Sequence, residues 1–306
     1  MWLRIPFIIS ILLVLISGCT EDHNKKGPLG RSLVATTGLI GDLTSAIAGP
    51  EFQVTSLMGP GVDPHLYKAT QGDLERLQNA DIIFFNGLHL EGKMAELLEK
   101  LSTRKPCFPV SRDIDRTKLR SPKEFQGNFD PHIWFDISLW REASLLIEKE
   151  LAERYPELEG GIRARALKYR ERLDELHEWT RGEIAAIPKA QRILVTAHDA
   201  FGYFGRAYDI EVMGLQGIST ASEFGLNDLA TLSETIISRK VKAVFVESSV
   251  PERFINALQE GVQARGHEIK KGGSLFSDAL GSADSPEGTY LGMIRYNVET
   301  IVKALK

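Results

Sequence analysis

The stretch Asp81-Ile82-Ile83-Phe84-Phe85 decides the fold class, because four apolar residues follow one another without alternation. A strand that is apolar on both faces is typical of a parallel sheet covered by helices on both sides. The sequence around it alternates between short strand patterns and helical patterns, at 33–37, 39–48, 52–57 and 70–79. The last helix begins with Thr70 and Asp73 spaced as in a capping box. This alternation predicts an α/β fold.

The same rhythm returns in the second half of the chain. Strand patterns and helical patterns lie there at 192–196, 199–208, 211–213, 226–239, 243–246 and 251–265. Between the two series, apolar residues at steps of four and three form one stripe of a helix, from near Glu157 to before Pro188. An ordinary outer helix or a coiled-coil segment would show the same stripe, but we favour a stiff connection. The predicted fold is therefore two α/β lobes, each a mostly parallel sheet with flanking helices, joined by one long backbone helix.

Composition narrows the class of protein. A length of 306 residues suggests two domains, and a hydrophobic fraction of 43% excludes a largely disordered chain. The 37 basic and 41 acidic residues give a net charge of −4, which argues against a nucleic-acid partner. The chain has two cysteines, Cys19 and Cys107, so we expect no disulfide framework.

The N-terminus has the pattern of an export signal. Arg4 precedes an apolar run from Ile5 to Ile16, which is too short to span a bilayer but suits the core of a signal peptide. The run ends in Ile16-Ser17-Gly18-Cys19, which resembles a bacterial lipobox whose cysteine receives lipid. A plain secretory signal with an incidental Cys19 is the alternative. We expect acyl chains on Cys19 to anchor the protein to a membrane.

The placement of the histidines indicates the function. The tripeptide Asp-Pro-His occurs twice, as Asp63-Pro64-His65 and as Asp130-Pro131-His132. Proline restricts its own backbone and that of the preceding residue, so each imidazole projects from a stiff loop. Asp63 and Asp130 can accept hydrogen bonds and orient the histidine, as residues behind metal ligands do. One such tripeptide would more often be a capped turn, but the repeat favours a metal site.

Two further candidates follow predicted strands in the second half. His198 comes after the strand at 192–196, and Asp278 comes after a short apolar run. Loops at the carboxyl ends of strands are where ligands bind in open α/β sheets. Three imidazoles and one carboxylate suit a divalent transition metal, although His198 could instead be a helix-start histidine and Asp278 an N-cap. Asp199 and Glu247 are candidates for a supporting position behind the ligands, with a loop-organising role as the alternative for Glu247.

The phrases around these residues resemble the cluster A-I metal-binding lipoproteins, the solute-binding protein 9 family of bacterial ABC importers. The resemblance runs from about Val34 to the C-terminus. The similar phrases are Gly61–Tyr67, Asp130–Asp136, Ala197–Phe204, Gly217–Glu223, Val246–Ser249 and Gly288–Gly292. The resemblance implies that a metal lies in the cleft between two lobes. The implied ligands are His65 and His132 from the first lobe, with His198 and Asp278 from the second.

The resemblance also implies a function. The protein would be an extracytoplasmic lipoprotein that captures zinc or manganese, with Fe²⁺ also possible, and delivers it to a membrane permease and its ATPase. Many zinc-specific members carry a His-rich loop before the second Asp-Pro-His, whereas residues 107–128 contain no histidine, which keeps manganese open. Because an imidazole must be neutral to bind a metal, we expect capture to weaken as the pH falls toward about 6.5.

The expected organisation has five parts. They are a lipoprotein signal peptide (1–18), a lipidated flexible tether (19–31), an N-terminal metal-binding lobe (32–156), the linking helix (157–187) and a C-terminal metal-binding lobe (188–306). We expect a monomer that is exported to the periplasm or cell surface and is not an enzyme. The alternatives are a secreted zinc-dependent hydrolase, which would lack the usual His-Glu-x-x-His motif, and a metal-stabilised adhesin.

Overall fold

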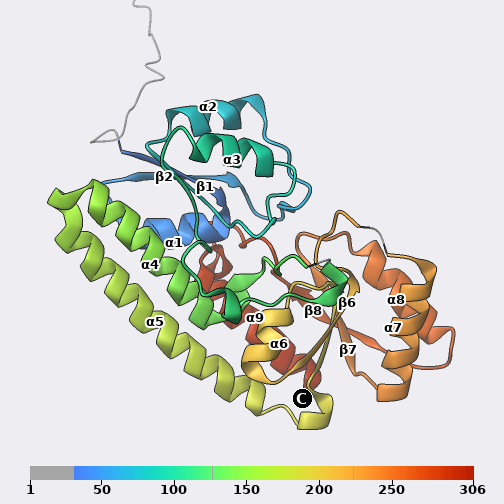
Figure 1. Ribbon diagram of the computed structural model, residues 1–306. Helices are drawn as coiled ribbons and strands as arrows, with labels where there is room; N and C mark the ends of the chain where they lie inside the picture. Colours follow the sequence, from blue (N-terminus) through green and yellow to red (C-terminus); the bar gives the residue numbers. More distant parts are fainter. Residues whose placement is uncertain (1–30, 126, 223) are drawn as a thin grey trace, which may run out of the picture.

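Two parallel sheets form two lobes in the computed structural model, which describes residues 31–125, 127–222 and 224–306 (Figure 1). The predicted signal peptide, Cys19 and nearly all of the predicted tether lie outside the described residues. The first sheet has the order β2-β1-β3-β4 and the second β6-β5-β7-β8. The strands are β1 (Ser32–Thr37), β2 (Gln53–Met58), β3 (Ile82–Phe85), β4 (Cys107–Pro109), β5 (Ile193–His198), β6 (Glu211–Gln216), β7 (Ala243–Glu247) and β8 (Lys270–Leu275).

The first lobe has the predicted buried strand. Ile82, Ile83 and Phe84 of β3 are almost completely buried, and β3 pairs in parallel with β1 on one side and β4 on the other. The helices packed against this sheet are α1 (Gly38–Ala48), α2 (Gln71–Asn79) and α3 (Ala95–Ser102). Thr70 and Asp73 form the predicted capping box at the start of α2. The continuous apolar stretch is therefore a central strand of a parallel sheet, as predicted.

The second lobe repeats this arrangement. The predicted strands correspond to β5, β6 and β7, and the predicted helices to α6 (Gly202–Tyr208), α7 (Leu226–Arg239) and α8 (Arg253–Gln263). One expectation was wrong in detail: His198 is the last residue of β5 rather than a loop residue. The structure adds five elements to those expected from the sequence: β4, β8, α3, α4 (Ile137–Arg154) and α9 (Tyr290–Leu305).

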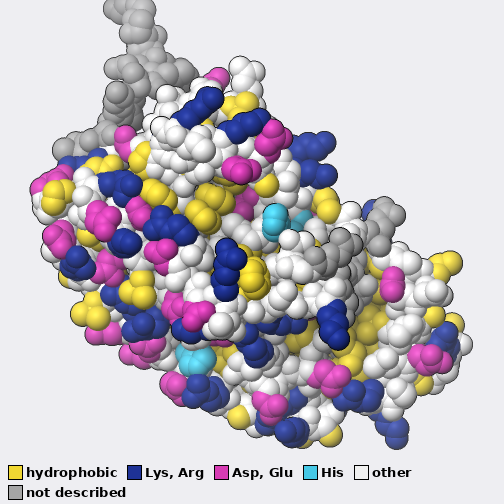
Figure 2. Space-filling view, in the orientation of Figure 1, with side chains coloured by type: hydrophobic (Ala, Val, Ile, Leu, Met, Phe, Trp, Pro, Cys, Tyr) yellow, Lys and Arg dark blue, Asp and Glu magenta, His cyan; other side chains and the backbone are white. Residues whose placement is uncertain are grey.

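A 27-residue helix, α5 (Glu159–Ala185), runs alongside both lobes (Figure 1). It packs against α1 and α4 at one end and against α6 and α9 at the other. The predicted apolar stripe is buried against these helices: Ile162, Ala166, Tyr169, Leu173 and Leu176. On its outer face, Arg163 pairs with Glu159 at 2.7 Å, and acidic and basic side chains are interspersed (Figure 2). The helix is therefore held to both lobes along its buried face.

Aromatic side chains join the lobes beside α5. The rings of Trp140 on α4 and Tyr290 on α9 stack with centroids 5.4 Å apart. The Tyr290 hydroxyl donates a hydrogen bond to the Trp134 carbonyl at 2.7 Å, and the Trp134 indole donates to the Ser277 carbonyl at 2.9 Å. Because Trp134 follows His132 by two residues and Ser277 precedes Asp278, this core holds two candidate ligands in place. No helix within the described ranges has the length and apolar character needed to cross a bilayer.

Candidate metal centre

Four predicted residues converge between the lobes. One ligand atom from each of His65, His132, His198 and Asp278 lies within 4.8 Å of the others. All four side chains are buried, with 2% or less of each residue exposed. His65 and His132 come from the first lobe, and His198 and Asp278 come from the second. Residues more than 200 positions apart therefore share one buried space.

Both Asp-Pro-His tripeptides form the same local turn. The Asp63 carboxylate accepts a hydrogen bond from the His65 backbone N–H at 2.9 Å, and Asp130 accepts one from His132 at 3.0 Å. Asp130 also lies 2.8 Å from Nδ1 of His132, and its other oxygen pairs with the Arg120 guanidinium. A proton on Nδ1 of His132 leaves Nε2 as the atom that faces the cluster.

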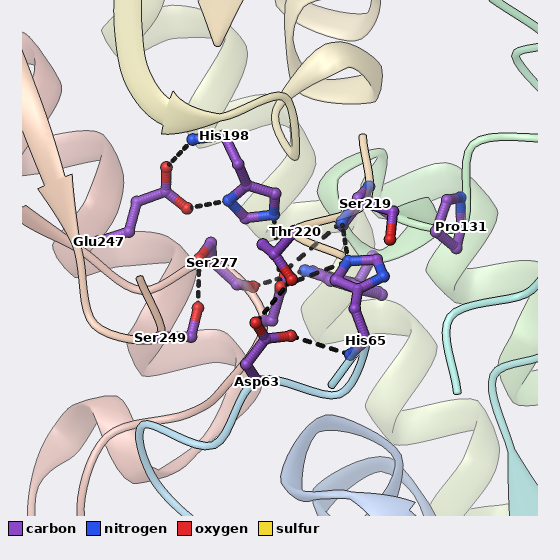
Figure 3. A network of polar contacts seen from close by, with 12 residues as sticks. Asp63, His65, Pro131, His198, Ser219, Thr220, Glu247, Ser249 and Ser277 are labelled. Atoms are coloured by element: carbon purple, nitrogen blue, oxygen red, sulfur yellow. Dashed lines mark hydrogen bonds and ion pairs between the residues drawn. The ribbon is translucent and has the colours of Figure 1, made fainter. Parts of the chain in front are cut away.

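The second lobe supports His198 in a similar way. Glu247, the last residue of β7, accepts a hydrogen bond from the His198 backbone N–H at 2.8 Å. Its other oxygen lies 2.6 Å from Nδ1 of His198 (Figure 3). Nε2 is therefore the ring nitrogen that faces Asp278, at 3.3 Å. Asp199 differs from the other supporting candidates. Within the described residues, its carboxylate makes no hydrogen bond or ion pair with any of the four predicted ligands.

The atoms that face one another form a donor set for a cation. Nε2 of His65 lies 3.4 Å from Nε2 of His132, and the Asp278 oxygens lie 3.5 Å from His132 and 3.7 Å from His65. Within the described residues, Nε2 of His198 and both Asp278 oxygens have no hydrogen-bond partner of good geometry. Buried polar atoms are nearly always satisfied, so the convergence of these atoms on one point indicates a site that could hold a cation.

Burial and charge shift the pKa values of this cluster in different directions. Burial lowers the pKa of His65 to about 3. Burial also opposes ionisation of Asp278, but the imidazoles of His198, His132 and His65 outweigh it and lower the pKa of this carboxyl. For His198, burial acts to lower the pKa, yet Glu247 and Asp278 raise it well above its usual value. At neutral pH and without metal, His198 therefore carries a proton while His65 is neutral.

We expect metal binding at pH 7 to release about one proton, from His198, because only the neutral imidazole can bind the metal. Below its raised pKa, a proton on His198 competes with the metal, so affinity increases as the pH rises. His65 adds no competition above about pH 5, since its pKa is about 3. Titration calorimetry in buffers of different ionisation enthalpy measures the proton count. Glu247→Gln should reduce it, and a count of zero for the unmodified protein would contradict this assignment.

Several residues around the cluster were missed by sequence reasoning. Arg120 lies ten residues before Asp130 and has no motif that marks it. The Tyr203 hydroxyl donates to the Asp130 carbonyl at 2.9 Å, and the Thr220 hydroxyl donates to Asp63 at 2.6 Å. Both lie inside phrases that the sequence analysis noted only for their resemblance. The sequence therefore marks the positions of Tyr203 and Thr220, but it does not show the hydrogen bonds that these residues make.

Comparisons with known proteins agree on one family. The family described as "ZnuA: Zinc-uptake complex component A periplasmic" matches residues 33–304. The manganese-binding lipoprotein MntA of Bacillus subtilis (strain 168) is 47% identical over 292 residues, 95% of each chain. The zinc-binding protein TroA of Treponema pallidum (strain Nichols) is 45% identical over 298 residues, 96% of each chain. The solved structure of periplasmic TroA from T. pallidum has a TM-score of 0.88 at 46% identity, and the match covers 90% of this chain and 99% of that one.

Proposed function

Because the chain belongs to the ZnuA family of periplasmic zinc-uptake components, we propose that it is the solute-binding lipoprotein of an ABC importer. It captures a divalent transition metal between its lobes and delivers the ion to a membrane permease that works with an ATPase. The observation that carries this function is the convergence of three imidazoles and one carboxylate from two lobes. Similar chains are named for manganese and for zinc, so both ions are candidate cargo.

The donor set favours a transition metal. Imidazole nitrogens suit zinc and iron, whereas calcium and magnesium prefer oxygen ligands, and manganese is a harder ion for which the Asp278 carboxylate is the better ligand. With His65, His132 and His198 neutral and Asp278 ionised, a divalent ion leaves the site with a charge of +1. Affinity for nitrogen-rich sites increases from manganese through iron to zinc, so the ion that is carried depends on supply as well as on geometry.

Binding of the metal favours the closed arrangement of the lobes. A cation that takes His65 from one lobe and Asp278 from the other binds best when the lobes are together, and it shifts the population toward that state. Because the four ligands are buried, the ion leaves only when these residues move apart. Capture and release are therefore coupled to separation of the lobes, and α5 with its aromatic neighbours limits how far they separate.

A binding role agrees better with the site than catalysis does. A hydrolytic zinc site has three protein ligands and an open position for water, whereas four protein ligands fill a tetrahedral site. The proposal further includes the signal peptide at 1–18 and lipid on Cys19, which anchors the exported chain. The word lipoprotein in the names of relatives such as MntA supports the proposed lipid on Cys19. A single chain holds all four ligands, which supports a monomer as the carrier.

The first test is His65→Ala. Binding of zinc by four ligands is worth about 10–16 kcal/mol, so loss of one ligand should lower affinity by about 100-fold or more. Competition titration with a chromophoric chelator measures this for Zn²⁺, Mn²⁺ and Fe²⁺. The matched control is His177→Ala on α5, where the imidazole lies 3.0 Å from the Tyr208 hydroxyl, away from the cluster. Unchanged affinity in His65→Ala would remove His65 from the site.

A further inference from the structure

One side chain of the first lobe contacts both a predicted ligand and the second lobe. Asp63 accepts a hydrogen bond from the His65 backbone N–H at 2.9 Å through one oxygen. Its other oxygen accepts a hydrogen bond from the Thr220 hydroxyl at 2.6 Å (Figure 3). Thr220 lies in the second lobe, between β6 and α7. A single carboxylate therefore ties the turn that carries His65 to the opposite lobe.

The position of His65 depends strongly on the hydrogen bonds of Asp63. The rings of His132 and His198 each have a supporting carboxylate of their own. A carboxylate outside the four predicted ligands lies beside each of the other two rings, Asp130 at 2.8 Å from Nδ1 of His132 and Glu247 at 2.6 Å from Nδ1 of His198. In the part of the chain that the structure describes, the one carboxylate that pairs with the His65 ring is Asp278, itself a predicted ligand. The position of the His65 imidazole therefore follows from the backbone of its turn, which Asp63 holds.

The hydrogen bond between Asp63 and Thr220 is more accessible to water than the buried contacts of Trp134 between the lobes. The Trp134 indole and the Ser277 carbonyl form an interlobe hydrogen bond between fully buried residues. Asp63 is partly exposed, and Thr220 lies at the limit of burial with 9% of its surface accessible. Gly61, at the start of the turn, is exposed, yet a Cβ added to it would lie 3.4 Å from the Ser248 carbonyl oxygen of the second lobe. The turn therefore rests on the second lobe at a place where water can compete for its hydrogen bonds.

We propose that Thr220 is a positioning residue whose hydrogen bond to Asp63 latches the turn carrying His65 onto the second lobe and sets the rate of metal release. This inference rests on the proposed capture of a metal by the four ligands. When the lobes part, the Thr220–Asp63 hydrogen bond breaks, and His65 is the first ligand to leave because, among the described residues, its ring pairs with no carboxylate outside the cluster. His132 and His198 keep the orientation that Asp130 and Glu247 give them.

The test compares Thr220→Val, Thr220→Ser and Ser222→Ala in the full-length protein. Valine has nearly the shape of threonine but lacks the hydroxyl, serine keeps the hydroxyl, and Ser222 is an exposed residue of the same loop. Proteins loaded with Zn²⁺ are mixed rapidly with excess chelator, and the release of the ion is followed. We expect Thr220→Val to release zinc about tenfold faster, which corresponds to 1.4 kcal/mol. Thr220→Ser should stay within about twofold of the unmodified protein, and Ser222→Ala should match it.

Thermal unfolding of the metal-free proteins separates a latch from a general loss of stability. The latch predicts nearly equal unfolding temperatures for Thr220→Val and the unmodified protein. It is overturned if Thr220→Val releases zinc at the unmodified rate, if Thr220→Ser is as fast as Thr220→Val, or if the metal-free valine variant is clearly destabilised. Failure of the unmodified protein to bind zinc, manganese or iron would instead overturn the proposed function, so the two failures are distinguishable.

Discussion

Asp278→Asn should lower metal affinity by about 1,000-fold or more, the largest loss expected from an isosteric change in this protein. Asp278 supplies the one negative charge among the four predicted ligands, and it is almost completely buried. Two unit charges 4 Å apart interact by about 4 kcal/mol at the effective dielectric constant typical of protein sites, which corresponds to about 1,000-fold in affinity. Asparagine keeps the shape of the side chain and removes this attraction. Competition titration with Zn²⁺ measures the loss.

The matched control for this variant is Asp199→Asn. Asp199 is also a partly buried carboxylate, next to His198 in the chain, but it makes no ion pair with the predicted ligands within the described residues. Its replacement should change affinity by no more than about threefold. If Asp278→Asn retained affinity within tenfold of the unmodified protein, Asp278 would not be a ligand. Equal losses in the two variants would point to a general effect of charge rather than coordination.

His198→Glu should destabilise the metal-free protein and bind metal poorly, although a second carboxylate would bring the charge of the loaded site to zero. The reason is Glu247, whose carboxylate lies 2.6 Å from Nδ1 of His198 and would face the new carboxylate directly. Buried charges without a partner typically cost about 3–5 kcal/mol of stability. We therefore expect a loss of about 3 kcal/mol in the free energy of unfolding at pH 7, measured by denaturant titration of the metal-free variant.

The double variant His198→Glu with Glu247→Gln should regain most of this stability, because glutamine can donate a hydrogen bond to the new carboxylate. With two carboxylates and two imidazoles, the ratio of zinc to manganese affinity should fall by at least about tenfold, since oxygen ligands favour the harder ion. Glu247→Gln alone is the control. A single His198→Glu variant as stable as the unmodified protein would show that Glu247 does not oppose a charge at position 198.

The sequence was sufficient to predict the α/β class, because Ile82, Ile83 and Phe84 are apolar without alternation and are indeed buried from both sides. It was insufficient for α4, which lies against both α1 and α5 and buries residues on several faces, including the charged Glu148 and Glu150. Such a helix has no single apolar stripe to recognise. The strand β8 has the sequence Lys-Lys-Gly-Gly-Ser-Leu, so pairing with β7 rather than local propensity makes it a strand.

The four residues that converge in the structure could be proposed together as ligands from the sequence, because the Asp-Pro-His repeat and the strand ends point to the same kind of site. The contacts behind them depend on which strands are neighbours. Glu247 reaches His198 because β5 and β7 are adjacent in the sheet, and their separation of 49 residues gives no local sign of this. The position of Arg120 is still harder to predict. A Cβ added to Gly202 would lie 1.3 Å from the Arg120 guanidinium. The place that Arg120 takes beside Asp130 therefore requires a glycine in the other lobe.

Complete burial of the four ligands affects how the ion is exchanged with the surroundings. A competing chelator cannot attach to an ion that it cannot touch, so no mixed complex of protein, ion and chelator forms while the lobes are together. Exchange then follows a dissociative route, and its rate does not depend on chelator concentration once the chelator is in excess. In the proposed carrier role, the protein therefore protects its cargo from stronger metal chelators while the lobes are together, and the ion reaches the permease only after the lobes open.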